Sequence, residues 1–176
     1  MGASLFTNIL QVGIVVKDLD EAVKRYWHQY GIGPWAIYDF NPKTVKEMIL
    51  HGKPAEYSMH LAMTFVGNVE IELMEPKDDK SIYAEFLKEH GEGLHHLAVD
   101  TQGYRQTVDF FEKKGWVYCR AAYGKHHGIA ILTHLRTWDS SWRSMMKTLI
   151  LYILNQRLYI HPEQFFLGIG MVANRP

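Results

Sequence analysis

The sequence predicts an α+β fold in which two βαβββ modules form a curved mixed sheet around a cleft. The main observation is an internal repeat, because residues 11–31 and 96–115 follow the same strand–turn–helix pattern. Three residue pairs share one offset between the copies: Gln11 with His96, Val23 with Val108, and Tyr26 with Phe111. The second observation is that no low-complexity linker separates the copies. We therefore expect one domain over residues 1–176.

The first module is expected over residues 8–78. Residues 9–16 alternate as a strand does, with Val12, Ile14 and Val16 on one face and Gln11 on the other. Asp18, with Glu21 three residues later, predicts a helix N-cap, and Gly31 predicts the end of that helix. A second strand is expected over 35–40.

A hairpin completes this module. Residues 57–65 alternate, and Gly67-Asn68 predicts a tight turn into a strand over 69–75. We expect the apolar side of each strand to pack on helices and the other side to line the cleft. On 57–65 this places Met59, Leu61 and Met63 under the helices and His60 in the cleft.

The second module is expected over residues 92–135, after a short helix that Ser81 caps and Gly91 ends. It contains a strand over 94–100, a helix over about 104–114, and a strand over 116–122. The pattern then stops, so this module is expected to be incomplete. Residues 136–176 form a divergent tail, in which we expect a helix near 144–157.

Composition limits the possible functions. The chain has 176 residues, 47% of them hydrophobic, and 19 basic side chains balance 19 acidic ones. A balanced charge does not favour nucleic-acid binding, which usually shows a basic excess. Cys119 is the single cysteine, and 148–154 is too short an apolar run to span a bilayer. We expect a cytoplasmic protein that does not associate with membranes.

The polar sides of the strands predict a metal site. They carry Gln11, His60, either Glu70 or Glu72, and His96. An amide oxygen, a carboxylate and an imidazole together suit Zn²⁺, Ni²⁺, Co²⁺, Mn²⁺ or Fe²⁺. The alternative is that these side chains are hydrogen-bonded packing residues, as most strand histidines are. His95, of opposite parity to His96, is expected to be structural.

These segments resemble the vicinal oxygen chelate superfamily, which includes glyoxalase I, methylmalonyl-CoA epimerase, extradiol dioxygenases and bleomycin-resistance proteins. The resemblance covers about residues 8–130 and rests on the repeat, on QVGIVVKDLDEAVKRY, and on VEIELMEP followed by SIYAEFLKEHGEGLHHLAVD. It implies a divalent metal held by four side chains, one from each of four strands. Three positions fall on Gln11, Glu72 and His96. The combination resembles animal glyoxalase I, while HGEGLHHLA resembles methylmalonyl-CoA epimerase.

The resemblance implies a lyase or isomerase that transfers a proton α to a carbonyl through a metal-bound enediolate or enolate. His60 is the candidate catalytic base, the substrate is expected to be a small carbonyl compound or thioester, and the protein is expected to be a homodimer. The alternative function is a non-catalytic small-molecule binder like the bleomycin-resistance proteins, with Trp35, Tyr38, Phe40 and Tyr57 lining the cleft. A third possibility is an inactive relative with a disrupted last strand.

The fourth ligand should be a glutamate on the last strand, and no segment of the expected type follows Gly128. Glu163 and His161 are the substitutes that the tail offers. A hypothesis is that the tail is a frameshifted reading. With permitted codons, a one-base shift turns AILTHLRTWDSSWRS into QYLHTLELGTVVGEV, and Met145-Met146 then forces a stop. The coding DNA decides this.

Overall fold

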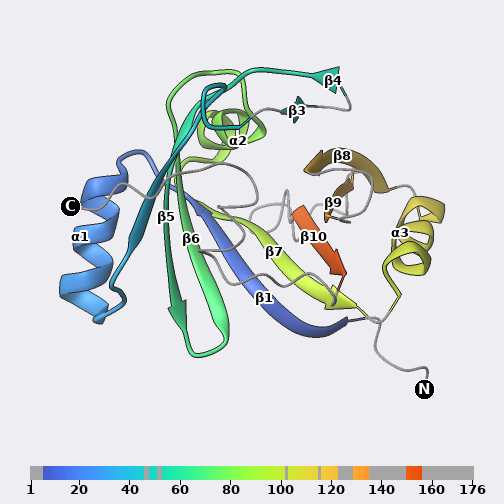
Figure 1. The fold of residues 1–176 in the computed structure, drawn as a ribbon, viewed down its shortest axis with the longest axis horizontal. Coiled ribbons are helices and arrows are strands. Elements are labelled where there is room, and N and C mark those ends of the chain that lie inside the picture. Colours follow the sequence, from blue (N-terminus) through green and yellow to red (C-terminus); the bar gives the residue numbers. More distant parts are fainter. Residues whose placement is uncertain are drawn as a thin grey trace.

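The computed structural model describes residues 6–45, 48–50, 53–101, 103–114, 116–122, 129–134 and 150–155 (Figure 1). The elements are β1 (Phe6–Val15), α1 (Leu19–Tyr30), β2 (Ala36–Phe40), β3 (Ile49–Leu50), β4 (Lys53–Pro54), β5 (Met59–Val66), β6 (Val69–Pro76), α2 (Ile82–His90), β7 (Gly93–Thr101), α3 (Tyr104–Lys113), β8 (Trp116–Ala122), β9 (Ile129–His134) and β10 (Ile150–Asn155).

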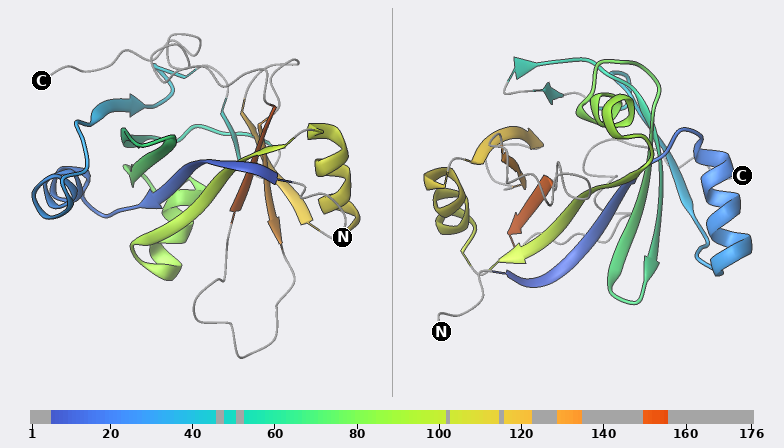
Figure 2. Two further views of the ribbon diagram at one scale, coloured as in Figure 1. Left: turned by 90° about the horizontal axis from the view of Figure 1, so that it is seen from below. Right: turned by 180° about the vertical axis from the view of Figure 1, so that it is seen from behind.

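One mixed sheet has the order β2-β5-β6-β1-β7-β10-β9-β8, and it curves through the molecule (Figures 1 and 2). Its two halves have the same topology. In the first half β1 pairs in parallel with β6, and β5 and β2 follow antiparallel. In the second half β7 pairs in parallel with β10, and β9 and β8 follow antiparallel. The halves meet where β1 and β7 pair antiparallel. The prediction of paired βαβββ modules is confirmed.

The last strand of the second half comes from the tail. β10 pairs with β7 as β6 pairs with β1, so the fourth strand that seemed to be missing is supplied by Ile150–Asn155. The expected helix over 144–157 is wrong for 150–155. The run ILYILN is rich in β-branched and aromatic residues, which suit a strand that must pair on both edges. The other residues of the tail lie outside the described part of the chain.

Local signals mark the ends of the first elements. The Asp18 side chain accepts a hydrogen bond from the Glu21 N–H at 2.9 Å, which satisfies one free donor at the start of α1. Gly31 ends this helix in the left-handed conformation, with φ of 66°. Gly67 takes φ of 60° in the turn between β5 and β6. The predicted capping and hairpin are confirmed.

Ser81 caps α2 from a fully buried position and accepts a hydrogen bond from the Ala84 N–H at 3.1 Å. Replacing Ser81 with alanine should lower the free energy of unfolding by about 1 kcal/mol, because the helix loses this acceptor. Ser81→Thr keeps a hydroxyl and should lose less. Urea denaturation of both variants checks this, and equal losses would contradict a capping role.

The two faces of the sheet carry different clusters. On the outer face, α1 packs through Leu19 and Ala22 on Val16, Ala62 and Leu73. On the inner face lies a larger cluster that includes Tyr38, Phe40, Tyr57, Met59, Leu61, Met63, Met74 and Tyr83. The predicted assignment of β5 is therefore wrong, because its large apolar side chains face inward and the small Ala62 packs near α1. The inner face is itself apolar, so hydrophobicity alone did not distinguish the two sides.

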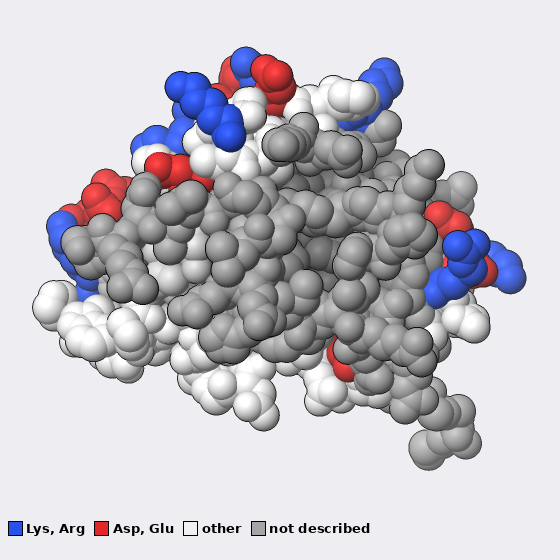
Figure 3. Space-filling model, viewed as in Figure 1, with Lys and Arg blue, Asp and Glu red and all other residues white. Residues whose placement is uncertain are grey.

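Charged groups of both signs adjoin one another on the surface shown in Figure 3, over α1 and over α3. This agrees with the equal numbers of basic and acidic residues in the chain. Among the helices that the structure describes, none combines the length and the apolar character required to span a bilayer.

Candidate metal centre

Three strands at the centre of the sheet bring the predicted ligands together. The register pairs Gly13 with both Glu72 on β6 and His96 on β7, and it pairs Gln11 with Glu70. Cross-strand partners point to the same side of a sheet, so these side chains share the inner face. The Nε2 atom of His96 lies 3.1 Å from Oε1 of Gln11 and 3.4 Å from Oε2 of Glu72.

These separations fit a common ion. Two ligand atoms that each lie about 2.1 Å from one ion are about 3.0 Å apart at a right angle and about 3.4 Å apart at the tetrahedral angle. Within the described part of the chain, no three His, Cys, Asp or Glu side chains group closely enough to hold an ion. The amide oxygen of Gln11 is therefore a necessary member of this donor set.

Glu70 holds the Gln11 side chain in place. The Gln11 Nε2–H donates to Oε1 of Glu70 at 2.6 Å, which turns the amide oxygen toward His96. Burial and the neighbouring Glu72 carboxylate raise the pKa of Glu70 to about 7, although the bond from Gln11 opposes this. Two carboxylates thus lie near one another in a partly buried place, a concentration of negative charge that attracts a cation.

Gly13 makes room for the His96 ring, a feature that strand alternation does not predict. A Cβ atom at position 13 would overlap the Cε1, Nε2 and Nδ1 atoms of His96. The ring therefore lies directly over the backbone of β1, and His96 is only 1% exposed. A glycine inside a strand often marks such a close approach, and this was the signal available in the sequence.

His95 lies behind His96 and does not face the opposite side of the sheet. Its Nδ1 is 3.0 Å from Nδ1 of His96, and its ring lies beside Tyr83 and Phe86 of α2. His95 is 0% exposed, and burial together with the neighbouring His96 lowers its pKa well below the usual value. The prediction that His95 is a structural residue did not include this contact with His96.

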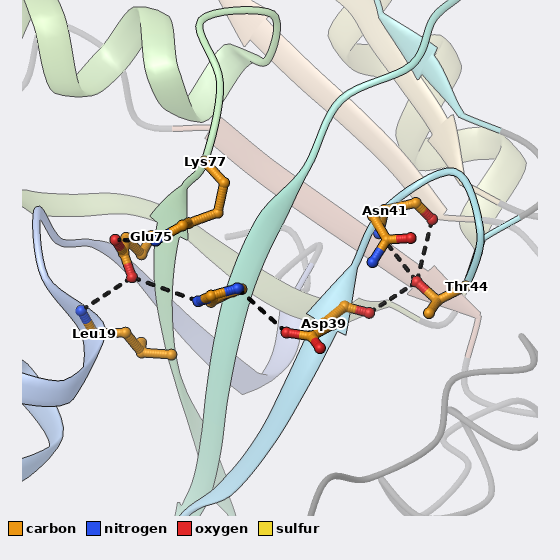
Figure 4. A network of polar contacts seen from close by, with 7 residues as sticks. Leu19, Asp39, Asn41, Thr44, Glu75 and Lys77 are labelled. Atoms are coloured by element: carbon orange, nitrogen blue, oxygen red, sulfur yellow. Dashed lines mark hydrogen bonds and ion pairs between the residues drawn. The ribbon is translucent and has the colours of Figure 1, made fainter.

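His60 lies on the outer face, so its predicted place in the cleft is wrong. It shares the β5 parity of Ala62, which packs with α1. Its Nε2 lies 3.3 Å from Oδ1 of Asp39, and its Nδ1 lies 3.7 Å from Oε2 of Glu75. Figure 4 shows these two carboxylates, with Glu75 also next to the Leu19 N–H at the start of α1. The position gives the catalytic assignment of His60 no support, because the sheet separates it from His96.

The fourth ligand that the resemblance implies would fall on β10. Gly13 pairs with Glu72 on β6, and its counterpart Ala98 pairs with Tyr152 on β10. Tyr152 thus holds the position that corresponds to Glu72, and no residue of β10 is acidic. The candidates Glu163 and His161 lie outside the described residues.

Comparison with known proteins identifies the family. The sequence model of the glyoxalase/bleomycin resistance protein/dioxygenase superfamily matches residues 10–133, which include both copies of the repeat. The chain belongs to this superfamily. The match includes Gln11, Glu72 and His96, and it ends before β10.

Solved structures of the superfamily share this fold. A methylmalonyl-CoA epimerase from Mycobacterium tuberculosis is 21% identical with a TM-score of 0.58, covering 94% of this chain and 95% of its own. A hypothetical protein from Bacillus halodurans is 17% identical with a TM-score of 0.59, covering 88% of this chain and 97% of its own. At these identities the likeness concerns the fold alone.

A curated relative matches over part of the chain. The 4-hydroxyphenylpyruvate dioxygenase of Legionella pneumophila is 35% identical over 77 residues, which are 43% of this chain and 22% of the dioxygenase. The chain thus matches about a fifth of the length of that enzyme.

Proposed function

We propose that this protein is a divalent-metal-dependent lyase or isomerase of the glyoxalase I or methylmalonyl-CoA epimerase type, which transfers a proton α to a carbonyl group. The observation that carries the proposal is the convergence of Gln11 and Glu72 on Nε2 of His96. An imidazole, a carboxylate and an amide suit Zn²⁺, Ni²⁺, Co²⁺ or Mn²⁺. A cation held there supplies a Lewis acid that polarises the carbonyl and stabilises the charge that develops on deprotonation.

The side chains of the site have separate tasks. Gln11, Glu72 and His96 bind the ion, and Glu70 orients the Gln11 amide. The buried inner-face cluster, in which the rings of Phe40 and Tyr57 stack with centroids 5.5 Å apart, excludes water from that side of the sheet. An apolar surrounding strengthens electrostatic interactions with a developing charge. The substrate is a small carbonyl compound or thioester, and we expect the protein to act as a homodimer.

The test measures exchange of the α-proton. The protein, loaded with Co²⁺ or Zn²⁺, is incubated in D₂O with methylmalonyl-CoA or with a glutathione hemithioacetal. We expect deuterium at the carbon next to the carbonyl, as seen by NMR. Metal-free protein should show none. Absence of exchange with every carbonyl substrate, despite a stoichiometric bound ion, would contradict the proposed reaction.

His96→Ala tests the metal site itself. The variant should lose stoichiometric metal binding, because the imidazole is the ligand on which the other two converge. His60→Ala is the matched control, since His60 lies on the outer face, and it should retain the metal content of the wild type. Elemental analysis of the three purified proteins makes the comparison. Unchanged metal in His96→Ala would refute the site.

The second candidate function is that of a metal-free binding protein. The sequence of β10, which contains no acidic residue, favours this function. Tyr152 stands where a fourth carboxylate is expected, and the inner face is rich in methionine and aromatic residues. These buried side chains are of the kind that lines pockets for apolar ligands. A purified wild type without a stoichiometric ion, even after incubation with excess Zn²⁺ or Co²⁺, would favour this function over the enzyme.

A further inference from the structure

His95 and His96 are consecutive, yet their rings touch because β7 contains an irregularity at this point. The register pairs Gly13 with His96 and Ile14 with Leu94, so His95 is an extra residue without a partner on β1. An extra residue of this kind is a β-bulge, which bends the strand and changes the direction of a side chain. The bulge thus brings the two Nδ1 atoms to 3.0 Å.

The hydrogen bond between these atoms requires one donor and one acceptor. The Nε2 atom of His95 is buried and has no hydrogen-bond partner among the described residues. The ring centroids of Tyr83 and Phe86 lie 4.8 Å and 5.1 Å from the centroid of His95. An N–H group is attracted by aromatic faces, whereas a lone pair is repelled. These surroundings favour the tautomer of His95 that carries its proton on Nε2 and accepts at Nδ1.

The same bond fixes the state of His96. If Nδ1 of His95 accepts, Nδ1 of His96 must be the donor. With a cation between Nε2 of His96 and the oxygens of Gln11 and Glu72, the lone pair of a neutral His96 is on Nε2 and binds the ion. Metal-bound histidines generally donate their second N–H to a hydrogen-bond acceptor, and this bond sets both the tautomer and the orientation of the ring.

The geometry points to His95 as a positioning residue of the metal site: its imidazole accepts a hydrogen bond from His96 and holds Nε2 of His96 ready to bind the ion. This role rests on the proposed function. A partner of this kind typically raises metal affinity by roughly 10–100-fold. Carboxylates, backbone carbonyls and water are the usual partners of metal-bound histidines. Here the burial of His95 beside two aromatic rings favours the required tautomer.

The test compares the binding of Co²⁺ alone to four variants. His95→Phe keeps an aromatic ring but loses the acceptor, so Co²⁺ should bind roughly 10–100-fold more weakly. His95→Asn places an amide oxygen near the position of Nδ1 and should restore most of the loss. His90→Phe is the control, since His90 also lies beside Phe86, at a centroid distance of 5.0 Å, and it should bind like the wild type. His96→Ala tests the site itself.

If the His95→Phe variant does not fold, a second measurement on the wild type tests the same role. Nitrogen-15 NMR of the zinc-loaded wild type should show a proton on Nδ1 of His96 and a coupling across the hydrogen bond to Nδ1 of His95. A His95→Phe variant that binds Co²⁺ as tightly as the wild type, or a zinc-loaded wild type without coupling between the two Nδ1 atoms, would overturn the positioning role and leave the proposed function intact. A zinc-loaded wild type with His96 protonated on Nε2 would overturn both. A wild type that binds no ion, or a His96→Ala variant that binds normally, would overturn both.

Discussion

Replacing Gly13 with alanine should weaken divalent-cation binding by more than about 100-fold, beyond the usual effect of an outer-shell change. The new Cβ atom would overlap the His96 ring, so the ring must leave its position between Gln11 and His95. The crowding should also lower the free energy of unfolding by roughly 1–3 kcal/mol. Titration with Co²⁺ and thermal denaturation measure the two effects.

Gly103→Ala is the matched control for this change. The three atoms nearest to a Cβ atom at position 103 all belong to the side chain of Gln106, with Oε1 at 2.8 Å, and that flexible side chain can move away. In a His96→Ala background the Gly13→Ala change should cost little stability, because the ring that it would overlap is gone. If Gly13→Ala binds Co²⁺ like the wild type, the placement of His96 over β1 is wrong.

Glu72→Gln should weaken cation binding by more than about 100-fold, whereas Glu70→Gln should weaken it by about 10-fold or less. Glu72 faces Nε2 of His96 at 3.4 Å, so its charge acts directly on the ion. Glu70 contacts Gln11, and a glutamine at position 70 still offers an oxygen to the Gln11 amide. The two substitutions remove the same charge two residues apart on one strand. Calorimetric titration with Zn²⁺ and Mn²⁺ compares them.

The reverse ranking would assign the carboxylate ligand to Glu70. Residue patterns alone left the choice between Glu70 and Glu72 open, since both lie on the same side of β6. Equal, small effects for both variants would contradict a carboxylate ligand on β6 altogether. Circular dichroism of each variant separates a lost ligand from a lost fold.

Much of the fold could be predicted from the sequence because its signals are local and strong. Asp18, Gly31 and Gly67 mark a helix start, a helix end and a hairpin turn, and the structure has each feature where it was expected. The repeat predicted the two modules. β5 was assigned to the wrong side because its alternation shows which residues share a face but not which face points inward, and apolar groups cover both faces.

The residues of the proposed metal site could be named from the sequence, but the contacts that surround them could not. Gln11, Glu72 and His96 follow from strand parity and from the superfamily resemblance. The roles of His95 and Gly13 depend on a bulge and on a close approach between β1 and β7, which are properties of strand pairing across the repeat. Strand parity assumes a regular strand, so it placed His95 on the wrong side.

The C-terminal tail was the part of the chain whose role in the sheet could not be predicted from its sequence. The sequence offered no recognisable last strand, and the structure places Ile150–Asn155 in that position of the sheet. The hypothesis of a frameshift stays a prediction. Codons 124–146 of the coding DNA test it, because codons that do not permit QYLHTLELGTVVGEV in the shifted frame would exclude it.

We propose that the two halves of the sheet hold one divalent cation between them. X-ray diffraction from crystals grown with Co²⁺, recorded at the cobalt absorption edge, tests this most directly. We predict one anomalous peak about 2.0–2.2 Å from Nε2 of His96, with Oε1 of Gln11 and a carboxylate oxygen of Glu72 at similar distances. No peak at His96, or a peak that contacts His96 without the other two residues, would contradict a cation site shared by the two halves of the sheet.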